Sequence, residues 1–160
     1  MSTPRRENVG FGWGPTAASG LAKLQSQSTS NPSAVSQAAA LAALTGPMDF
    51  LDDWRTAYAQ RRDLVVERLN LIEGLQCPTP QGAFYVYPNC AGLIGKRSPD
   101  GRTIDDDSAL VMYLLDAQNV GTVQGAAFGL SPAFRISFAT SIDELNEGCD
   151  RIARACAELR

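Results

Sequence analysis

One segment of this 160-residue chain, FRISFA at residues 134–139, alternates between apolar side chains and polar or small ones. The apolar set is Phe134, Ile136 and Phe138, and the other set is Arg135, Ser137 and Ala139. Successive side chains of a strand point to opposite faces, so the pattern predicts one face packed on helices and one face open. The chain is therefore expected to build a small sheet that helices cover on one side.

The final helix of the chain is the element that the sequence predicts most plainly. Ser141 and Glu144 form an S-x-x-E capping box, which is typical of a helix N-terminus. Apolar residues then recur at spacings of three and four, which predicts one buried stripe on an amphipathic helix. The stripe consists of Ile142, Leu145, Cys149, Ile152, Cys156 and Leu159. Its two cysteines are therefore expected to serve as small core residues.

Apolar spacing elsewhere predicts three further helices and two further strands. The helices are expected at about residues 33–44, 47–73 and 105–118, and the strands at residues 83–87 and 120–123. In the first of these strands, Phe84 and Val86 are expected on one face, and Tyr85 and Tyr87 on the other. Residues 1–33 are rich in Gly, Ser, Thr, Gln and Pro, and we expect an irregular entry there. The mixed order of elements indicates an α/β fold of the two-layer α+β kind, with a small sheet covered by helices on one face.

Composition excludes several classes of function. A net charge of −3 does not resemble the basic surface of a nucleic-acid-binding protein. No run of about 18 apolar residues is present and the N-terminus has no apolar leader, so we expect no membrane association and a cytoplasmic location. The chain has no histidine, and its four cysteines form no C-x-x-C pair. Histidine-based catalysis and a structural metal site are therefore not expected.

Arg135 has two interpretations that the residues alone leave open. It can be a solvated charge beside Ser137 on the open face of the sheet. It can also be a binding residue, because a guanidinium grips a carboxylate with two parallel hydrogen bonds and a strand holds it rigidly. The alternation of side chains does not choose between these interpretations.

Several stretches together resemble a known family. They span Leu24–Pro47, Arg61–Asn70, Cys77–Gly101 and Val123–Ser141, and include the sequences QSTSNPS, CPTPQGAFYVYPN and AAFGLSPAFRISFATS. In this order and at this spacing they resemble class I aminotransferases, and more narrowly the bacterial aspartate aminotransferases. The resemblance runs from about Gly20 to Arg160, and we expect the residues before Gly20 to depart from the family.

The resemblance implies a fold type I enzyme that uses pyridoxal 5′-phosphate and acts on amino acids and 2-oxo acids as a homodimer. By this likeness, residues 1–33 are the tail of a large cofactor domain, residues 34–74 are connecting helices, and residues 75–160 form the C-terminal small domain. Certain residues fall on positions with known roles in the family. Arg135 falls on the arginine that binds the substrate α-carboxylate, Ser30 and Asn31 on a turn near the neighbouring subunit's active site, and Phe128 on a position beside the substrate pocket.

The chain also departs from the family. The Schiff-base lysine lies upstream of anything present, and neither Lys23 nor Lys96 matches its position. The aspartate that pairs with the pyridine nitrogen falls in the same missing part. No arginine stands in VGFGWGP, close to where the family's phosphate-binding arginine is expected. The resemblance therefore assigns no catalytic residue to this chain.

Three hypotheses follow. The chain is the C-terminal portion of an aspartate-type aminotransferase, inactive alone and without bound cofactor. Alternatively, it is a truncated, stand-alone module that self-associates, or half of a split aminotransferase whose lysine comes from a second chain.

Overall fold

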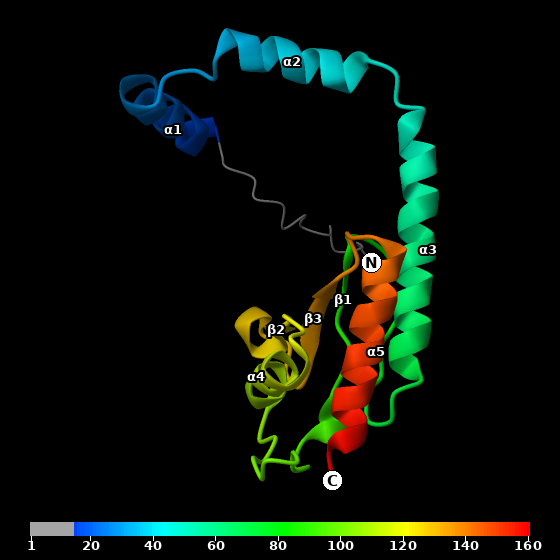
Figure 1. The fold of residues 1–160 in the computed structure, drawn as a ribbon. Coiled ribbons are helices and arrows are strands. Elements are labelled where there is room, and N and C mark those ends of the chain that lie inside the picture. Colours follow the sequence, from blue (N-terminus) through cyan, green and yellow to red (C-terminus); the bar gives the residue numbers. More distant parts are fainter. Residues whose placement is uncertain (1–14) are drawn as a thin grey trace, which may run out of the picture. The chain divides into compact units, whose positions relative to one another are not determined.

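The computed structural model describes residues 15–160 (Figure 1). These residues form two compact units, which divide between Met48 and Asp49. The first unit contains two helices, and the second contains the sheet and the remaining helices.

The first unit consists of α1 (Pro15–Ser28) and α2 (Ala34–Thr45). α2 confirms the predicted helix within one residue at each end, and none of its residues is buried. The irregular conformation expected before residue 33 is wrong for α1. Pro15 suits a first helical turn, and the Ala, Leu, Lys and Gln that follow outweigh Gly20 and the serines as helix formers.

The second unit begins with the long helix α3 (Phe50–Asn70) and ends with α5 (Ile142–Glu158), which packs along it (Figure 1). Between them come the remaining elements. These are β1 (Tyr85–Val86), η1 (Ala91–Leu93), α4 (Asp107–Gln118), β2 (Val123–Gln124), η2 (Gly125–Phe128) and β3 (Phe134–Ser137). β3 is the central strand of an antiparallel sheet in the order β1-β3-β2.

The core of the second unit lies between this sheet and the helices. Phe134 and Phe138 are buried at 0% and 2% exposure, and Ile136 packs against the same cluster. Arg135 is half-buried, whereas Ser137 and Ala139 are exposed. The two faces that the alternation predicted are therefore confirmed, and so is the two-layer fold class. α3, α4 and α5 supply the helical side of the core.

The predicted caps of α4 and α5 are largely confirmed, whereas α3 is three residues shorter at each end than the predicted helix at 47–73. The side chain of Asp106 accepts a bond from the Ala109 N–H at 2.7 Å, and Asn119 ends α4 in the left-handed conformation. Ser141 Oγ accepts from the Glu144 N–H at 3.2 Å, but the Glu144 carboxylate accepts from Thr140 Oγ1 instead of completing the box. Ile142 is 45% exposed, because the first turn of α5 projects beyond the core, while the rest of the predicted stripe is buried.

β1 and β2 differ from the predicted strands. β1 is only two residues long, because Ala83 takes a positive φ of 60° that a strand cannot continue through. Phe84, expected on the same face as the buried Val86, is 41% exposed, and the centre of its ring lies 4.4 Å from that of Tyr85. The strand expected at residues 120–123 begins only at Val123.

The described residues contain neither a membrane span nor a metal cluster. Within residues 15–160, no helix is both long enough and apolar enough to cross a membrane. The same range holds no group of three or more Cys, Asp or Glu side chains arranged to bind a metal ion. All four cysteines are buried free thiols.

Candidate functional site

Arg135 occupies the second position of the central strand β3, opposite Val123 of β2. Because β3 is hydrogen-bonded on both sides, its backbone is fixed and the start of the side chain is fixed with it. The guanidinium extends from the face of the sheet that the core does not use. This is a rigid base from which a charged group can meet a ligand.

Two aromatic rings hold the Arg135 guanidinium between them. Its Cζ atom lies 4.5 Å from the centre of the Tyr85 ring and 4.4 Å from the centre of the Phe128 ring. Tyr85 is directly opposite Ser137 in the sheet register, so it shares the face of Arg135. Phe128 comes from η2, the short turn after β2, and also meets the Tyr87 ring edge-on at 6.0 Å. We call Tyr85, Phe128 and Arg135 the aromatic clamp.

The hydrogen-bond donors of Arg135 are uncommitted in the described part of the chain. Among residues 15–160, no side chain or carbonyl forms a hydrogen bond or ion pair with its guanidinium. Several other arginines of the second unit do form such bonds. Arg68 donates to Asp150 and to Asn146 Oδ1, and Arg102 donates to Asp100 and Asp116 at 2.7 and 2.8 Å. The clamp thus presents a fork of N–H groups that suits a planar anion such as a carboxylate.

Two of the residues predicted for the site lie together in the second unit, and the other two belong to the first unit. Phe128 contacts Arg135, as described above. Ser30 and Asn31 belong to the first unit, in the turn between α1 and α2. Ser30 takes a left-handed φ of 59°, and its N–H donates to the Gln25 carbonyl at 2.8 Å. A role for Ser30 and Asn31 in lining an active site stays a prediction.

Sequence reasoning missed two residues of this region. Tyr85 was expected only to share a strand face with Tyr87, because its place beside Arg135 depends on the pairing of β1 with β3. Asp107 carried no signal beyond its position next to a helix cap, yet it is 1% exposed and contacts the turn that bears Phe128.

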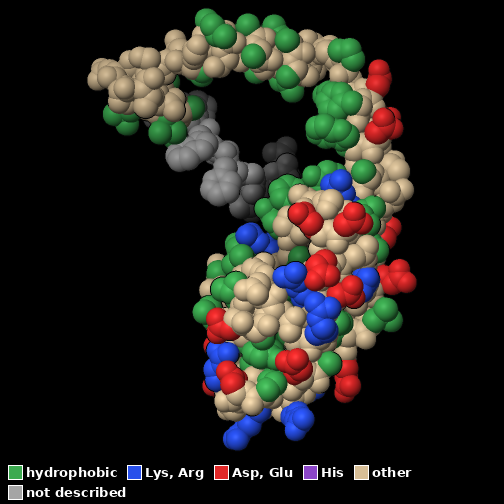
Figure 2. Space-filling view, in the orientation of Figure 1, with side chains coloured by type: hydrophobic (Ala, Val, Ile, Leu, Met, Phe, Trp, Pro, Cys, Tyr) green, Lys and Arg blue, Asp and Glu red, His purple; other side chains and the backbone are tan. Residues whose placement is uncertain are grey.

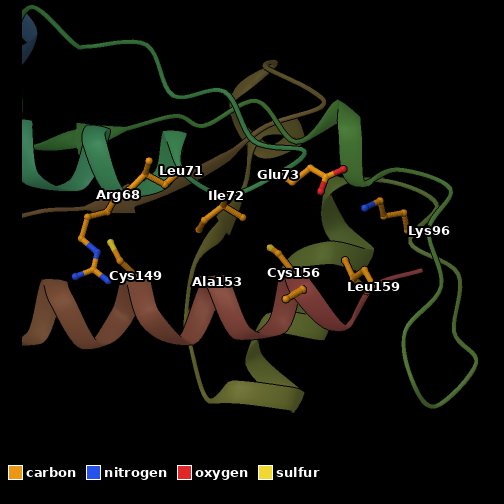
Figure 3. A pocket seen from close by; sticks show the side chains of 10 residues that line it. Arg68, Leu71, Ile72, Glu73, Lys96, Cys149, Ala153, Cys156 and Leu159 are labelled. Carbon is orange, nitrogen blue, oxygen red and sulfur yellow. The ribbon is translucent and has the colours of Figure 1, made fainter.

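A cavity of about 340 Å³ between the end of α3 and the second half of α5 offers less chemistry (Figure 3). Arg68 at one end is engaged by α5, and at the other end the side chains of Glu73 and Lys96 extend toward each other. Burial raises the pKa of the Cys156 thiol in its wall to about 12, so this sulfur is a poor nucleophile near neutral pH. The aromatic clamp is the better candidate site.

The residues around the clamp fit a carboxylate and do not fit pyridoxal 5′-phosphate. A phosphate cradle needs converging N–H groups or several cations, and a Schiff base needs a lysine. Arg135 is the single cation of the clamp, Lys96 lines the separate cavity, and Lys23 lies in α1 of the first unit. No catalytic step through that cofactor is therefore assigned to the described residues.

Comparison with known proteins gives consistent matches. A profile of the family described as "Aminotransferase class I and II" matches residues 7–152. "Aspartate aminotransferase" of Rhizobium meliloti (strain 1021) is 51% identical over 152 residues, which are 94% of this chain and 37% of that protein. "Aspartate/prephenate aminotransferase" of Cereibacter sphaeroides is also 51% identical, over 94% of this chain and 38% of its own length.

Solved structures agree with the sequence matches. The aspartate aminotransferase from Rhizobium meliloti superposes with a TM-score of 0.86 at 50% identity, over 91% of this chain and 36% of its own. The alanine aminotransferase from Pyrococcus furiosus gives a TM-score of 0.75 at 33% identity, over 89% and 34%. The chain thus spans a little over a third of the relatives that it matches. The expected departure before Gly20 is wrong from residue 7 onward, where the family match begins.

Proposed function

This chain belongs to the class I and II aminotransferase family, and from this premise we propose that it supplies the substrate-carboxylate end of an aspartate-type aminotransferase. In this role Arg135 binds the α-carboxylate of an amino acid or 2-oxo acid. The chain alone does not catalyse transamination, and the rest of the active site comes from a complementary region or chain.

One observation carries this proposal: the Arg135 guanidinium is held between two rings and its donors are uncommitted within residues 15–160. Contacts with two rings restrict the motion of the guanidinium, and both donors of one edge of its planar fork can meet a carboxylate. Arg135 is also half-buried, which strengthens the interaction of its guanidinium with an anion relative to that of a fully solvated ion. Arg135 thereby orients a substrate without taking part in bond changes.

An α-carboxylate anchor suits a reaction that converts amino acids into 2-oxo acids. Both classes carry the carboxylate directly on the carbon that reacts, so one arginine can serve both directions of the reaction. In the family, pyridoxal 5′-phosphate supplies the electron sink. The residues of this chain bind and orient the carboxylate, and the site around them is completed from elsewhere.

A complementation experiment tests the proposal. The full chain is mixed with pyridoxal 5′-phosphate, aspartate and 2-oxoglutarate, alone and together with the part of the Rhizobium meliloti enzyme that it does not match. We expect turnover only in the mixture, and a large loss in the mixture when Arg135→Ala replaces the native chain. Turnover by the chain alone, or turnover in the mixture that does not depend on Arg135, would overturn the proposal.

The alternative of a self-associating module is favoured by the exposed helix α2. Val35, Leu41 and Leu44 are 79%, 64% and 75% exposed, and α2 buries none of its residues. The first unit is dominated by apolar and neutral polar side chains, whereas charged ones gather on the second (Figure 2). Apolar exposure of this extent favours burial in a homodimer. Light scattering of the full chain checks this, and a monomer at the highest attainable concentration would argue against it.

A further inference from the structure

We infer that Asp107 is a positioning residue that fixes η2, and with it Phe128, against the Arg135 guanidinium. This inference rests on the proposed role of Arg135 as a carboxylate anchor. It adds a residue that touches neither the substrate nor the guanidinium, and that acts through the backbone of the turn between them.

Asp107 is a buried carboxylate with a specific partner. It is the first residue of α4, and its side chain is 1% exposed. Its Oδ2 atom accepts a hydrogen bond of 2.8 Å from the N–H of Ala126, the second residue of η2. Phe128 follows Ala126 by two positions in the same turn and packs on Arg135. The chain of contacts therefore runs from Asp107 through one backbone group to the clamp.

The two rings of the clamp are held in different ways. Tyr85 belongs to β1 and is fixed by the pairing of β1 with β3. Phe128 belongs to a turn that has no partner strand, so its position depends on how the turn is tied down. Of the two rings, Phe128 is therefore the one whose position relative to Arg135 can change.

The turn has two kinds of anchor. At its start, the Gly125 N–H donates to the Ala133 carbonyl at 2.7 Å, and the Gly125 carbonyl accepts from Leu130 N–H at 2.9 Å. A Cβ on Gly125 would lie 1.9 Å from the Leu130 oxygen, so this closure is tight. These bonds join the start of the turn to Leu130 and Ala133, which follow it in the same loop. Asp107 supplies the tie between the turn and α4, next to the residues that lead to Phe128.

A carboxylate at this buried position destabilises the fold unless its charge interacts with a partner. An ionised group buried without partners is strongly destabilising, and a well-packed apolar side chain would fill the same space. The start of α4 offsets part of the cost, because peptide dipoles at a helix N-terminus favour negative charge. The carboxylate also accepts the hydrogen bond from Ala126 N–H, and a hydrogen bond to an ionised group is stronger than one between neutral groups.

The test follows the Arg135 Nε–Hε resonance in the full chain by NMR, without ligand. Rings above and below a guanidinium displace this resonance upfield from those of solvent-exposed arginines. We expect Phe128→Leu to remove part of the displacement, and Asp107→Ala to remove as much. Asp107→Asn, which keeps an acceptor oxygen, should retain most of it.

Leu110→Ala is the matched control, since Leu110 is fully buried in the same helix and its truncation destabilises the chain while both partners of the Asp107–Ala126 bond stay in place. It should lower the unfolding midpoint and leave the resonance in place. An unmoved resonance in Asp107→Ala, or an equal movement in Leu110→Ala, would overturn the inference.

If Asp107→Ala does not fold, amide exchange in Asp107→Ser decides, because the shorter side chain withdraws the acceptor from the Ala126 N–H. Exchange at Ala126 N–H should become faster relative to exchange at Gly125 N–H, whose partner is Ala133, and an unchanged ratio would contradict the inference. A separate titration with 2-oxoglutarate tests Arg135 as an anchor. If 2-oxoglutarate does not bind while the Arg135 Nε–Hε resonance keeps its upfield displacement, the result counts against the proposed function. It does not count against the role of Asp107 in fixing the turn.

Discussion

The two faces of β3 have opposite relations to the rest of the molecule. Phe134 and Phe138 on one face are buried at 0% and 2% exposure among helices. Arg135 on the other face meets only two aromatic rings and has uncommitted donors within residues 15–160. The five consecutive residues 134–138 thus divide between a face that stabilises the fold and a face that is available to a ligand.

This difference teaches that stability and binding are separable within one strand. Side chains of the covered face are surrounded by protein, so their loss leaves cavities. Side chains of the clamp face have few contacts, so their loss costs little folding energy and removes donors for an anion. Mutations that alternate along β3 should therefore alternate in their effects.

Phe134→Ala should have the largest effect on folding. Removal of a fully buried phenylalanine is expected to lower the free energy of unfolding by about 3–5 kcal/mol. Urea denaturation followed by circular dichroism measures this change. A loss comparable to that of an exposed residue would show that the two faces of β3 are not distinct.

The buried cysteine thiols predict that the free energy of unfolding depends on pH. Burial is the main cause that raises the pKa of Cys77 and Cys90 to about 11 and that of Cys156 to about 12, from about 9. Because the folded pKa lies above the unfolded value, the contribution of each protonated thiol to the free energy of unfolding is complete below pH 9. It is lost as the pH rises toward 11–12. Each thiol contributes a slope of about 1.4 kcal/mol per pH unit in that window.

Denaturation curves at a series of alkaline pH values measure this slope. Cys156→Ala removes one of the buried thiols and should make the slope shallower. A slope that is the same with and without Cys156 would exclude the thiol as its source.

Arg135→Ala should leave the free energy of unfolding within about 1 kcal/mol of the native value. It should, however, abolish any response to carboxylate ligands. Arg135→Lys keeps the charge without the planar fork and should bind more weakly than the native chain. A stability loss as large as that of Phe134→Ala would show that Arg135 has a mainly structural role.

Phe128→Leu should have the smallest effect on stability, about 0.5–1 kcal/mol for one cation–π contact at an open site. Its main consequence should be a weaker affinity for 2-oxoglutarate, measured by NMR titration. Leu130→Ala, at an exposed position in the same loop, is the control. If both variants bind equally to the native chain, the Phe128 ring does not orient the guanidinium.

Periodic elements could be predicted from the sequence, whereas non-local geometry could not. Helical spacing predicted α3, α4 and α5, and alternation predicted both faces of β3, because each pattern is local. The short β1 depends on the positive φ at Ala83, and the clamp depends on the register that sets Tyr85 beside β3. The role of Asp107 depends on the contact between α4 and η2, which no spacing encodes. The role of Arg135 as a carboxylate anchor was predicted from the resemblance of its surrounding motifs to a known family.

The Arg135 Nε–Hε resonance, followed during titration with 2-oxoglutarate, tests the central claim most directly. A carboxylate anchor predicts a saturable shift of this resonance that weakens as salt is raised. The dimethyl ester of 2-oxoglutarate, which lacks the negative charges, should leave the resonance unmoved. An absent shift with 2-oxoglutarate, or an equal shift with its ester, would contradict the assignment of Arg135 as the carboxylate anchor.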